Sequence, residues 1–483
     1  MQRIDRFAIV LTQMALLTLF ASTASADEVA NVAESDRPAT VTIRDFGAVG
    51  DGRTDDTAAI QKAVDAGTGD IVLPRGVYRI TRPIVIDLDQ VGPTSIVGSG
   101  TARIVMAGPG PALKFIGTHG GTASPATVKP NVWQRQRMPT VDGIEIVGAH
   151  EKAVGIEAVG TMKLVVSRVL VREALHGIHL VTRNRNVIIA NCHLYKNRGV
   201  GLYLDDVNLH QINVTGCHIS YNAAGGIVVR AGCVRNLHVT GCDIEANRFN
   251  VLVDGAGSPP ATAEVAIVGC TLQHAGGPDS ANVRFIGADG EGQRAWGQLT
   301  IADNVLTDVE VNIDVQKARG VSISGNTFGT GYRYNLRVVD SSQVVVGPNC
   351  LDRNPKYRDA ETADNGLLFR NCEDVTITGL HVNDVRRARA GLVLENCRRM
   401  NLTNCTILDC EHGGILLENC AHSRVSDCLI RNDRPEAKTW LPLVVTGGRG
   451  NMIVNNLLSG PLEVDPQSAY ASGNVTQPLE DRE

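Results

Sequence analysis

Short segments in which apolar and polar residues alternate recur along most of the chain, from residue 144 to about residue 455. Each repeat opens with an apolar-x-apolar segment, passes through Cys, Asn or a small residue, and after a turn enters a second apolar-x-apolar segment. The openings recur every 20–34 residues, at Ile144, Leu164, Val187, Ile212, Leu237, Val265, Leu299, Val321, Val344, Val375, Met400, Ser423 and Asn451. Alternation with period two indicates strands with one buried face. A repeat of this length without helical segments indicates one coil of a solenoid, so we predict an all-β parallel β-helix of about 13 coils.

Cysteine and asparagine recur at fixed places in this repeat. One cysteine set comprises Cys192, Cys217, Cys242, Cys270, Cys405 and Cys428, a second comprises Cys372, Cys397 and Cys420, and an asparagine set comprises Asn197, Asn222 and Asn247. Like residues at repeat positions stack into ladders, and parallel side-chain vectors disfavour disulfide geometry. We therefore expect buried thiols, with disulfides and metal binding as the alternatives; no Cys-x-x-Cys occurs.

The first 26 residues have the pattern of an export signal. Arg3 and Arg6 precede an apolar stretch, residues 7–20, and Ala24-Ser25-Ala26 has the small-x-small form of a cleavage site. We expect residues 1–26 to be this signal, 27–40 a linker, 41–470 the β-helix with an N-terminal cap over 41–100, and 471–483 a polar tail. The stretch is too short to span a bilayer, so the protein is expected to be secreted, periplasmic or on the cell surface, without a membrane span.

The predicted cap begins with a recognisable motif. Residues 45–52 read Asp-Phe-Gly-Ala-Val-Gly-Asp-Gly and are followed by Thr54-Asp55-Asp56-Thr57, where an amphipathic helix with Ile60, Ala63 and Val64 on one face is expected to start. An Asp there would cap the helix, and calcium binding is the alternative for this Asp cluster. The motif resembles the entry motif of the pectate-lyase-like superfamily, which includes rhamnogalacturonases, polygalacturonases, exported lyases, epimerases and phage tailspikes. The resemblance covers roughly residues 40–470 and implies a right-handed parallel β-helix with a bias towards polysaccharide chemistry.

Composition narrows the choice of partner. The formal net charge is −5, so no overall basic field favours nucleic acid. Aromatic residues make up only 4% of the chain, against 50 glycines, so the core must be built from aliphatic residues between many turns.

The central residue of each second strand points away from the core, and these residues locate a candidate site. They are Glu157, His179, Tyr203, Val228, Leu252, Arg284, Asp314, Arg337, Leu368, Val393, Leu416 and Val444. Arg284, Asp314 and Arg337 interrupt a mostly apolar row on consecutive coils. Insertions at about 254–281, 286–298 and 350–365 would flank them, carrying the candidate substrate-binding residues Trp296, Lys356, Tyr357 and Arg358. A surface ladder in which these charges merely pair with one another is the alternative.

These residues fit an acidic sugar chain, because Arg binds carboxylates bidentately. The leading hypothesis is a polysaccharide lyase or uronate epimerase that abstracts the C5 proton. Arg284 and Arg337 would neutralise the carboxylate, with Ca²⁺ as an alternative cation, and Tyr332 or Tyr334 would act as base or acid. The sequence specifies no cofactor, sugar, linkage or oligomeric state.

Two other functions remain open. A glycoside hydrolase needs two carboxyl groups, for which Asp314 with Asp340 or Asp308 is the nearest set. The paired carboxylates Asp205-Asp206 lack the neighbouring motifs of polygalacturonases, and the Asp-Pro-His motif of mannuronan epimerases is absent. A binding or adhesion module without catalysis is the second possibility.

A second candidate surface contains His193, His218 and Asp243, each one residue past a ladder cysteine. Such a set could bind a metal or carry a proton.

Overall fold

The computed structural model describes residues 41–121, 124–256, 261–290, 293–294, 296–356, 362–434 and 440–477, and only the backbone of residues 289–290 and 293–294. The predicted signal and linker, Tyr357, Arg358 and the last six residues of the predicted tail lie outside this part. The chain divides into Met1–Val41 and a compact unit Thr42–Glu483, and the fold below is that of the second.

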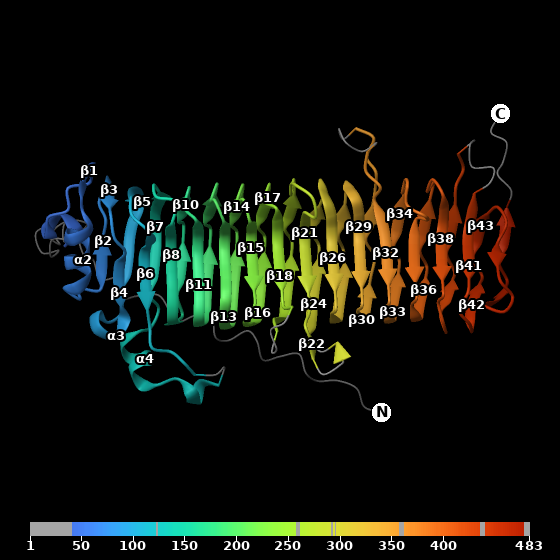
Figure 1. Ribbon diagram of the computed structural model, residues 1–483, viewed down its shortest axis with the longest axis horizontal. Helices are drawn as coiled ribbons and strands as arrows, with labels where there is room; N and C mark the ends of the chain where they lie inside the picture. The colour runs from blue at the N-terminus through green and yellow to red at the C-terminus, as the bar shows by residue number, and fades with distance from the viewer. Residues whose placement is uncertain are drawn as a thin grey trace, which may run out of the picture. The chain divides into compact units, whose positions relative to one another are not determined.

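Parallel strands stack into a β-solenoid of about 15 turns, which confirms the predicted fold class (Figure 1). Each coil contributes one rung to each of three ladders. The first-strand ladder contains β2 (Asp70–Val72), β5 (Ser95–Met106), β7 (Thr140–Gly148), β9 (Val165–Ser167), β11 (His176–Ala190), β13 (Val200–Thr215), β16 (Cys233–Thr240), β19 (Ala263–Val268), β24 (Gly297–Ala302), β27 (Arg319–Ser324), β30 (Ser342–Val346), β33 (Glu373–Thr378), β36 (Arg398–Thr403), β39 (Arg424–Ser426), β42 (Asn451–Val454) and β45 (Ala469–Ser472).

The short-strand ladder follows the corner at which Cys192, Cys217, Cys242, Cys270, Cys405 and Cys428 lie. Besides β5 and β7 it contains β1 (Asp51–Asp55), β3 (Gly76–Ile80), β10 (Leu170–Arg172), β12 (His193–Tyr195), β14 (His218–Ser220), β17 (Asp243–Glu245), β20 (Thr271–Gln273), β25 (Val305–Leu306), β28 (Thr327–Phe328), β31 (Cys350–Leu351), β34 (His381–Asn383), β37 (Thr406–Leu408), β40 (Leu429–Arg431), β43 (Leu457–Ser459) and β46 (Val475–Gln477).

The second-strand ladder carries the outward row singled out in the sequence. Besides β11 and β13 it contains β4 (Ile84–Asp87), β6 (Gly110–Ile116), β8 (Ala153–Met162), β15 (Gly225–Arg230), β18 (Phe249–Asp254), β21 (Ala281–Ile286), β26 (Val309–Gln316), β29 (Gly331–Val339), β32 (Gly366–Arg370), β35 (Leu392–Glu395), β38 (Gly413–Glu418), β41 (Leu441–Thr446) and β44 (Glu463–Val464). The strands β22 (Asp289–Gly290) and β23 (Gln293–Arg294) form a separate antiparallel pair.

Two details of the predicted repeat are wrong. Ile146 pairs with Val171 in the short-strand ladder, and the first-strand rung of that coil is Val141, paired with Val166. The opening at Ile144 was misassigned because β7 runs through the corner without a break. Coils also begin earlier than expected, because β2 and β4, which lie in the predicted cap, already pair with the strands of the next coil.

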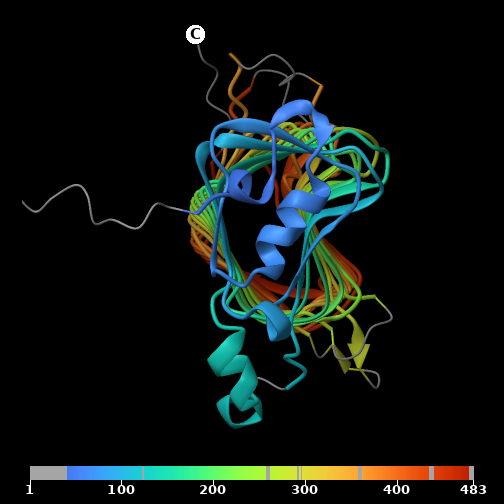
Figure 2. The ribbon, with the colours of Figure 1, turned by 90° about the vertical axis from the view of Figure 1, so that its left-hand side faces the viewer.

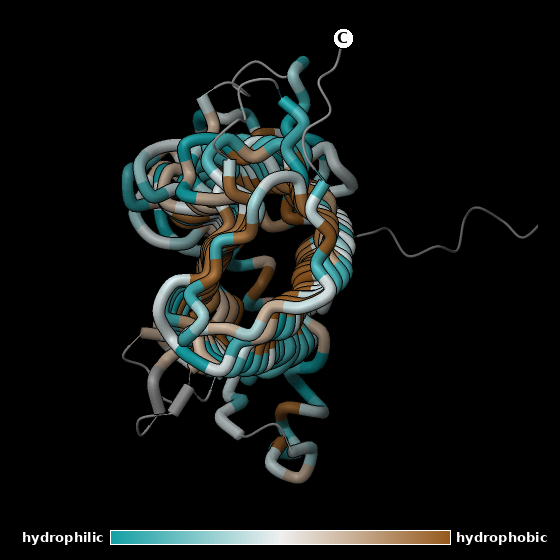
Figure 3. The backbone as a smooth tube through the Cα atoms, turned by 90° about the vertical axis from the view of Figure 1, so that its right-hand side faces the viewer, coloured by the Kyte–Doolittle hydropathy of each residue, from teal (hydrophilic) through white to brown (hydrophobic). Residues whose placement is uncertain are grey.

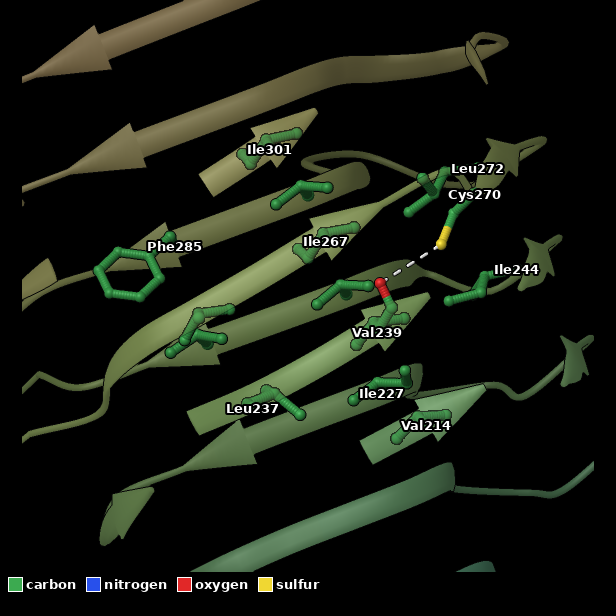
Figure 4. Packing of buried hydrophobic residues seen from close by; sticks show 14 of the residues in the cluster. Val214, Ile227, Leu237, Val239, Ile244, Ile267, Cys270, Leu272, Phe285 and Ile301 are labelled. Carbon is green, nitrogen blue, oxygen red and sulfur yellow. Dashed lines mark hydrogen bonds between the residues drawn. The ribbon is translucent and has the colours of Figure 1, made fainter. Parts of the chain in front are cut away.

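Buried apolar side chains from successive coils form one continuous core cluster. Figure 3, in which the backbone is coloured by hydropathy, shows apolar segments along the walls of the solenoid and polar ones mainly at its corners. The nine ladder cysteines are buried free thiols, as predicted. All of these thiols except Cys428 contact a backbone carbonyl of the preceding coil; the Sγ of Cys270, for example, lies 3.7 Å from the Val239 carbonyl oxygen (Figure 4). The asparagines stack in the same way: the Asn197 side-chain amide donates to Asn222 Oδ1 at 2.8 Å, and that of Asn222 donates to Asn247 Oδ1 at 3.0 Å.

The predicted cap helix is α2 (Thr57–Asp65), which lies across the N-terminal end of the stack (Figure 2) and buries Ile60, Ala63 and Val64. Its capping differs in detail from the expectation. The Asp56 side chain makes no cap hydrogen bond and instead accepts from the backbone N–H groups of Val49 (2.7 Å) and Gly50 (3.1 Å). Asp55 accepts from the Thr57 N–H at 3.1 Å. Both carboxylates therefore fasten the helix to the segment before it.

The remaining helices among the described residues lie in the first third of the chain. They are η1 (Ile43–Phe46), α3 (Leu88–Val91), η2 (Pro125–Thr127) and α4 (Pro130–Arg135). Within the described ranges, none of the helices combines the length and apolarity that a membrane crossing requires.

The outward row of the second-strand ladder is not an open surface, which corrects the expectation drawn from the sequence. Val228 is only 2% exposed, because it packs with Val200 and Leu252 and against Phe249. Further along the stack, Leu368, Ala390 and Val393 form a second such cluster with Tyr334 and Leu416. Side chains from the turns cover these rungs, so period-two alternation predicts which way a side chain points but not whether water reaches it.

Candidate functional site

The predicted triad forms one ion network on adjacent rungs. Arg284 pairs with Asp314 and Asp314 with Arg337 in the ladder register. The Asp314 carboxylate accepts from Arg284 Nε at 2.7 Å, from Arg337 Nη1 at 3.0 Å and from Gln316 Nε2 at 3.0 Å. The Asp314 side chain has no exposed surface, while those of Arg284 and Arg337 are 13% and 28% exposed. The three charges therefore pair with one another, as in the alternative interpretation, but around a buried Asp314 and not on the surface.

The other predicted site residues are spread around this network. Tyr334 packs in the apolar cluster with Leu368, and Tyr332 lies two residues before it on β29. Trp296 precedes β24 and stacks on Arg235, whose Cζ lies 4.9 Å from the ring centroid. Lys356 is exposed in the turn that follows β31. The two insertions thus lie at opposite ends of the second strands: one follows the end of β21, and the other precedes the start of β32.

The carboxylates grouped by the hydrolase hypothesis make separate contacts. Asp308 lies 3.5 Å from His274 Nδ1, and Asp340 accepts from the Asn371 side-chain amide at 2.9 Å. Asp314 is occupied by two guanidinium groups. This arrangement gives no support to an acid and base pair across one glycosidic bond.

The second predicted surface has the expected register. His193, His218 and Asp243 occupy adjacent rungs of the short-strand ladder. The two imidazole rings are stacked with centroids 4.9 Å apart, and His218 Nε2 lies 3.5 Å from Asp243 Oδ2. Among the residues that the structure describes, no group of three or more His, Cys, Asp or Glu side chains has a metal-binding arrangement.

A denser cluster of titratable groups lies nearer the N-terminal end of the outward row. Lys114, Glu157, His179 and Tyr203 occupy four successive rungs. Lys114 Nζ lies 3.0 Å from Glu157 Oε1, and His179 Nδ1 lies 3.6 Å from Glu157 Oε2. The other ring nitrogen of His179 lies 3.2 Å from Asp205 Oδ2. We call Glu157, His179, Tyr203 and Asp205 the acid–base array.

Aromatic stacking fixes the orientation of the central rings. The rings of His179 and Tyr203 are stacked, with centroids 5.3 Å apart and 9° between their planes. His176 packs against both, at 5.3 Å from the His179 ring and 4.9 Å from the Tyr203 ring. The array is partly buried, with 17% of the Glu157 side chain and 15% of the His179 side chain exposed. It is therefore accessible from outside yet partly withdrawn from water, a condition that strengthens its electrostatic interactions.

The environment sets distinct protonation states in this cluster. The neighbouring His179 ring, helped by Lys114, lowers the pKa of Glu157 to about 2. Burial, together with the Asp205 carboxylate, raises the pKa of Tyr203 to about 12. Burial lowers the pKa of His176 to about 4. At neutral pH the cluster thus holds an ionised Glu157, a protonated Tyr203 hydroxyl and a neutral His176.

A backbone contact fixes the tautomer of His176. Its Nδ1 accepts a hydrogen bond from the Val200 N–H at 3.1 Å, so the proton of the neutral ring lies on Nε2. Lys114 stands at one end of the array, and Arg230, the rung partner of Asp205, stands at the other. A proton donor, an imidazole between two carboxylates and two flanking cations are what acid–base chemistry on an anionic substrate requires.

The signal for this array was already present in the sequence. Glu157, His179 and Tyr203 interrupt the apolar outward row on three successive coils, as Arg284, Asp314 and Arg337 do. In the sequence, the long insertions beside the triad favour it over the array as the candidate site. Side-chain pairing separates the two groups: the Asp314 carboxylate is enclosed by guanidinium groups, whereas the array keeps polar atoms within reach of a ligand.

Comparison with known proteins gives two family matches. Residues 40–249 match the family described as Rhamnogalacturonase A/epimerase, pectate lyase-like, and residues 280–473 match the family described as Periplasmic copper-binding protein (NosD). The chain is 56% identical over 71 residues to Mannuronan C5-epimerase AlgE3 of Azotobacter vinelandii, a stretch that is 13% of this chain and 4% of that protein. It is 42% identical over 72 residues to Alginate lyase 7 of the same organism, covering 14% and 8% of the two chains. The chain thus spans less than a tenth of these relatives.

One solved structure shows the same fold at low identity. The pre-mature gene product 12 of bacteriophage phi29 superposes with a TM-score of 0.52 and 13% identity, covering 91% of this chain and 66% of that one.

Proposed function

Because the chain belongs to the pectate-lyase-like superfamily of parallel β-helix proteins, we propose that the acid–base array binds an acidic polysaccharide and abstracts the C5 proton of a uronate unit. The product would be that of a polysaccharide lyase or of a uronate epimerase. The observation that carries the proposal is the succession Lys114, Glu157, His179, Tyr203 on adjacent rungs, with Asp205 and Arg230 beside it.

The flanking cations have the first task in this chemistry. The C5 proton of a uronate becomes acidic only when negative charge on the neighbouring carboxylate is neutralised. Lys114 and Arg230 bracket the array, and Arg230 is exposed at the end of β15. Arg230 is suited to a planar carboxylate, since its guanidinium offers two parallel donors.

Proton transfer falls to the stacked pair. The Nδ1 lone pair of His179 takes the C5 proton, while the Nε2–H group donates to Asp205 and holds the ring in place. In a lyase the electron pair of the broken C5–H bond forms the C4=C5 double bond as the C4–O4 bond breaks. The Tyr203 hydroxyl, protonated at neutral pH because its pKa is about 12, then supplies the proton that the departing O4 takes up. In an epimerase the same carbanion is reprotonated at C5 from the other face.

The remaining groups orient the reacting ones. The ionised Glu157 stabilises positive charge that develops on His179. His176 packs under both rings and keeps them in place. The Arg284–Asp314–Arg337 network lies outside the reacting group in this proposal, because Asp314 is buried and both guanidinium groups donate to it. A polysaccharide substrate outside the cell agrees with the export signal predicted for residues 1–26.

One experiment tests the proposal. Purified protein is incubated in D₂O with alginate, polygalacturonate and glycosaminoglycans, and the products are followed by ultraviolet absorbance and proton NMR. A lyase gives unsaturated uronates that absorb, whereas an epimerase gives deuterium at C5 without new chain ends. If none of the polyuronates exchanges its C5 proton or is cleaved, the proposal is wrong.

A further inference from the structure

A row of basic side chains lies at the corner that follows the second-strand ladder. Arg185, His210 and Arg235 occupy successive rungs there. Arg183 lies two residues before Arg185, on the rung of Asn208, to whose side chain it donates. We call Arg183, Arg185, His210 and Arg235 the basic corner. The corner adjoins the acid–base array, because Val181, two residues before Arg183, is the rung partner of Asp205.

Among the residues that the structure describes, several buried donors at this corner have no partner. They are Nε and Nη2 of Arg183 and Nε1 of Trp296, and the ring nitrogens His119 Nε2 and His210 Nδ1 are buried without a partner as well. His119 is only 2% exposed. An unpaired buried polar atom costs free energy, so finding several at one corner indicates a place that a further hydrogen-bonding group completes.

The electrostatics of the corner point to an anion. Burial and the neighbouring Arg185 lower the pKa of Arg183, and burial together with Arg183 lowers the pKa of His119 to about 4. Burial also lowers the pKa of His210, an effect to which three nearby arginines contribute and which Glu264 opposes. Arg183 and Arg185 lie two residues apart on β11 and bring two positive charges close together at the corner. A bound anion would offset this repulsion.

Two insertions project from the edge on which the corner lies. The first, residues 117–139, carries α4, and its Ser124 carbonyl oxygen lies 3.4 Å from Arg185 Nη1. The second follows β21 and carries Trp296, which stacks on Arg235. Figure 1 shows α4 and β22 projecting from this edge. The basic corner is thus a cationic surface bounded on both sides.

We propose that the basic corner binds an oxyanion group, a carboxylate or sulfate, of an acidic glycan, at a contact separate from the acid–base array. The choice of ligand rests on the proposed function, because a glycan held at the array continues along the strand direction onto the corner. Arg183 lies four residues beyond His179 on β11, which is at most about 13 Å along an extended strand, and the chain turns between them at Thr182, whose φ is 58°. The contact would therefore hold a sugar unit within two or three positions of the reacting one.

The test measures binding separately from turnover. The double variant Arg183→Gln/Arg235→Gln is compared with Arg424→Gln/Arg449→Gln, which removes the same charge from the C-terminal coils. Both are made in a Tyr203→Phe background so that the ligand is not consumed. The probes are labelled oligosaccharides of polygalacturonate and alginate for carboxylates, those of heparin for sulfates, and inorganic sulfate.

The corner variant should bind the favoured oligosaccharide about tenfold more weakly or worse, with a shallower dependence on salt. The control should bind within about twofold of the parent, because an exposed arginine away from the ligand contributes little. A ligand-induced rise in melting temperature, lost only in the corner variant, provides a readout that also reports folding. Preference for uronate over heparin oligosaccharides identifies the carboxylate as the anion, and the reverse preference identifies sulfate.

Equal affinity in the two double variants, or no binding of any probe by the parent, would overturn the inference. These outcomes are distinguishable from failure of the proposed function. If the protein binds a glycan through the corner but exchanges no C5 proton, only the proposed acid–base chemistry is contradicted. If the corner variant, made without the Tyr203→Phe change, keeps full turnover and affinity, only the proposed role of the basic corner is contradicted.

Discussion

His179 and Tyr203 lie on adjacent rungs with their rings stacked 5.3 Å apart, and both contact the same carboxylate, Asp205. One carboxylate therefore holds an imidazole and a phenol in a fixed relation. The two rings come from different coils, so the accuracy of this relation depends on the register of β11 and β13.

Tyr203→Phe should abolish most activity while preserving the fold. The substitution keeps the ring that stacks on His179 and removes only the hydroxyl. We expect kcat to fall by about 100-fold or more, with a smaller change in KM, in steady-state assays on the preferred polyuronate. Tyr195→Phe, on the neighbouring ladder, is the matched control and should retain activity. Comparable losses in both variants would mean that the tyrosine acts through packing.

Asp314→Ala should destabilise the protein severely. Removing the buried carboxylate leaves Arg284 and Arg337 facing each other without a counter-charge. Breaking a buried ion pair in this way costs about 3–5 kcal/mol, which chemical denaturation would detect. Replacing all three residues by leucine should recover much of this loss. Arg337→Ala should cost less than Asp314→Ala, since its side chain is partly exposed.

Val228→Asp should be about as harmful as Ile227→Asp. The two side chains point to opposite faces of β15, yet both are buried, Ile227 in the main core and Val228 in the cluster with Val200 and Leu252. Each substitution would bury an unpaired carboxylate and cost several kcal/mol, on the order of a severe core mutation. Urea denaturation of the two variants measures the difference. A nearly neutral Val228→Asp would show that the cover over this rung opens readily.

Stability should decline as the pH falls from about 6.5 to 4. The pKa of His176 is lowered to about 4 in the folded protein, against about 6.5 for an unperturbed histidine. Between these values the unfolded chain binds a proton that the folded protein does not, so the free energy of unfolding falls as the pH falls, and this contribution levels off below pH 4. His176→Asn should flatten part of this slope in denaturation curves measured across the window. An unchanged slope would contradict the assignment of a neutral, buried His176.

The ladder cysteines should be reduced and protected. All twelve cysteines are free thiols, and Cys350 is the exposed one among them. Native protein should therefore release one rapid equivalent in a thiol assay, with the ladder thiols reacting only after denaturation. Mass spectrometry that found several intact disulfides would refute this. Cys350→Ser should remove the rapid equivalent.

Much of the fold was predictable because it depends on periodicity. The alternation in segments such as 237–239 and 227–229 gives the buried face directly, and the repeat gives the stacking of Cys217 on its neighbours. The covering of the outward row was not predictable, because it depends on how side chains of the same strands, such as Phe249 and Tyr334, pack over neighbouring rungs. The candidate site was predictable only in part, because the pairing of its side chains also depends on the folded structure. The sequence placed Glu157, His179 and Tyr203 on one face, but not the pairings that distinguish a reactive cluster from a closed ion network.

The asparagine ladder also defines a unit of length for the chain. Asn197, Asn222 and Asn247 are separated by 25 residues each, and every coil contacts mainly the coils before and after it. A genetic duplication or deletion of one whole coil would therefore leave all remaining rungs in register, whereas insertion or deletion of a single residue within a strand would exchange the inside and outside positions of that strand. The solenoid can thus change its length in whole coils, and with it the number of sugar units that its outer face can span.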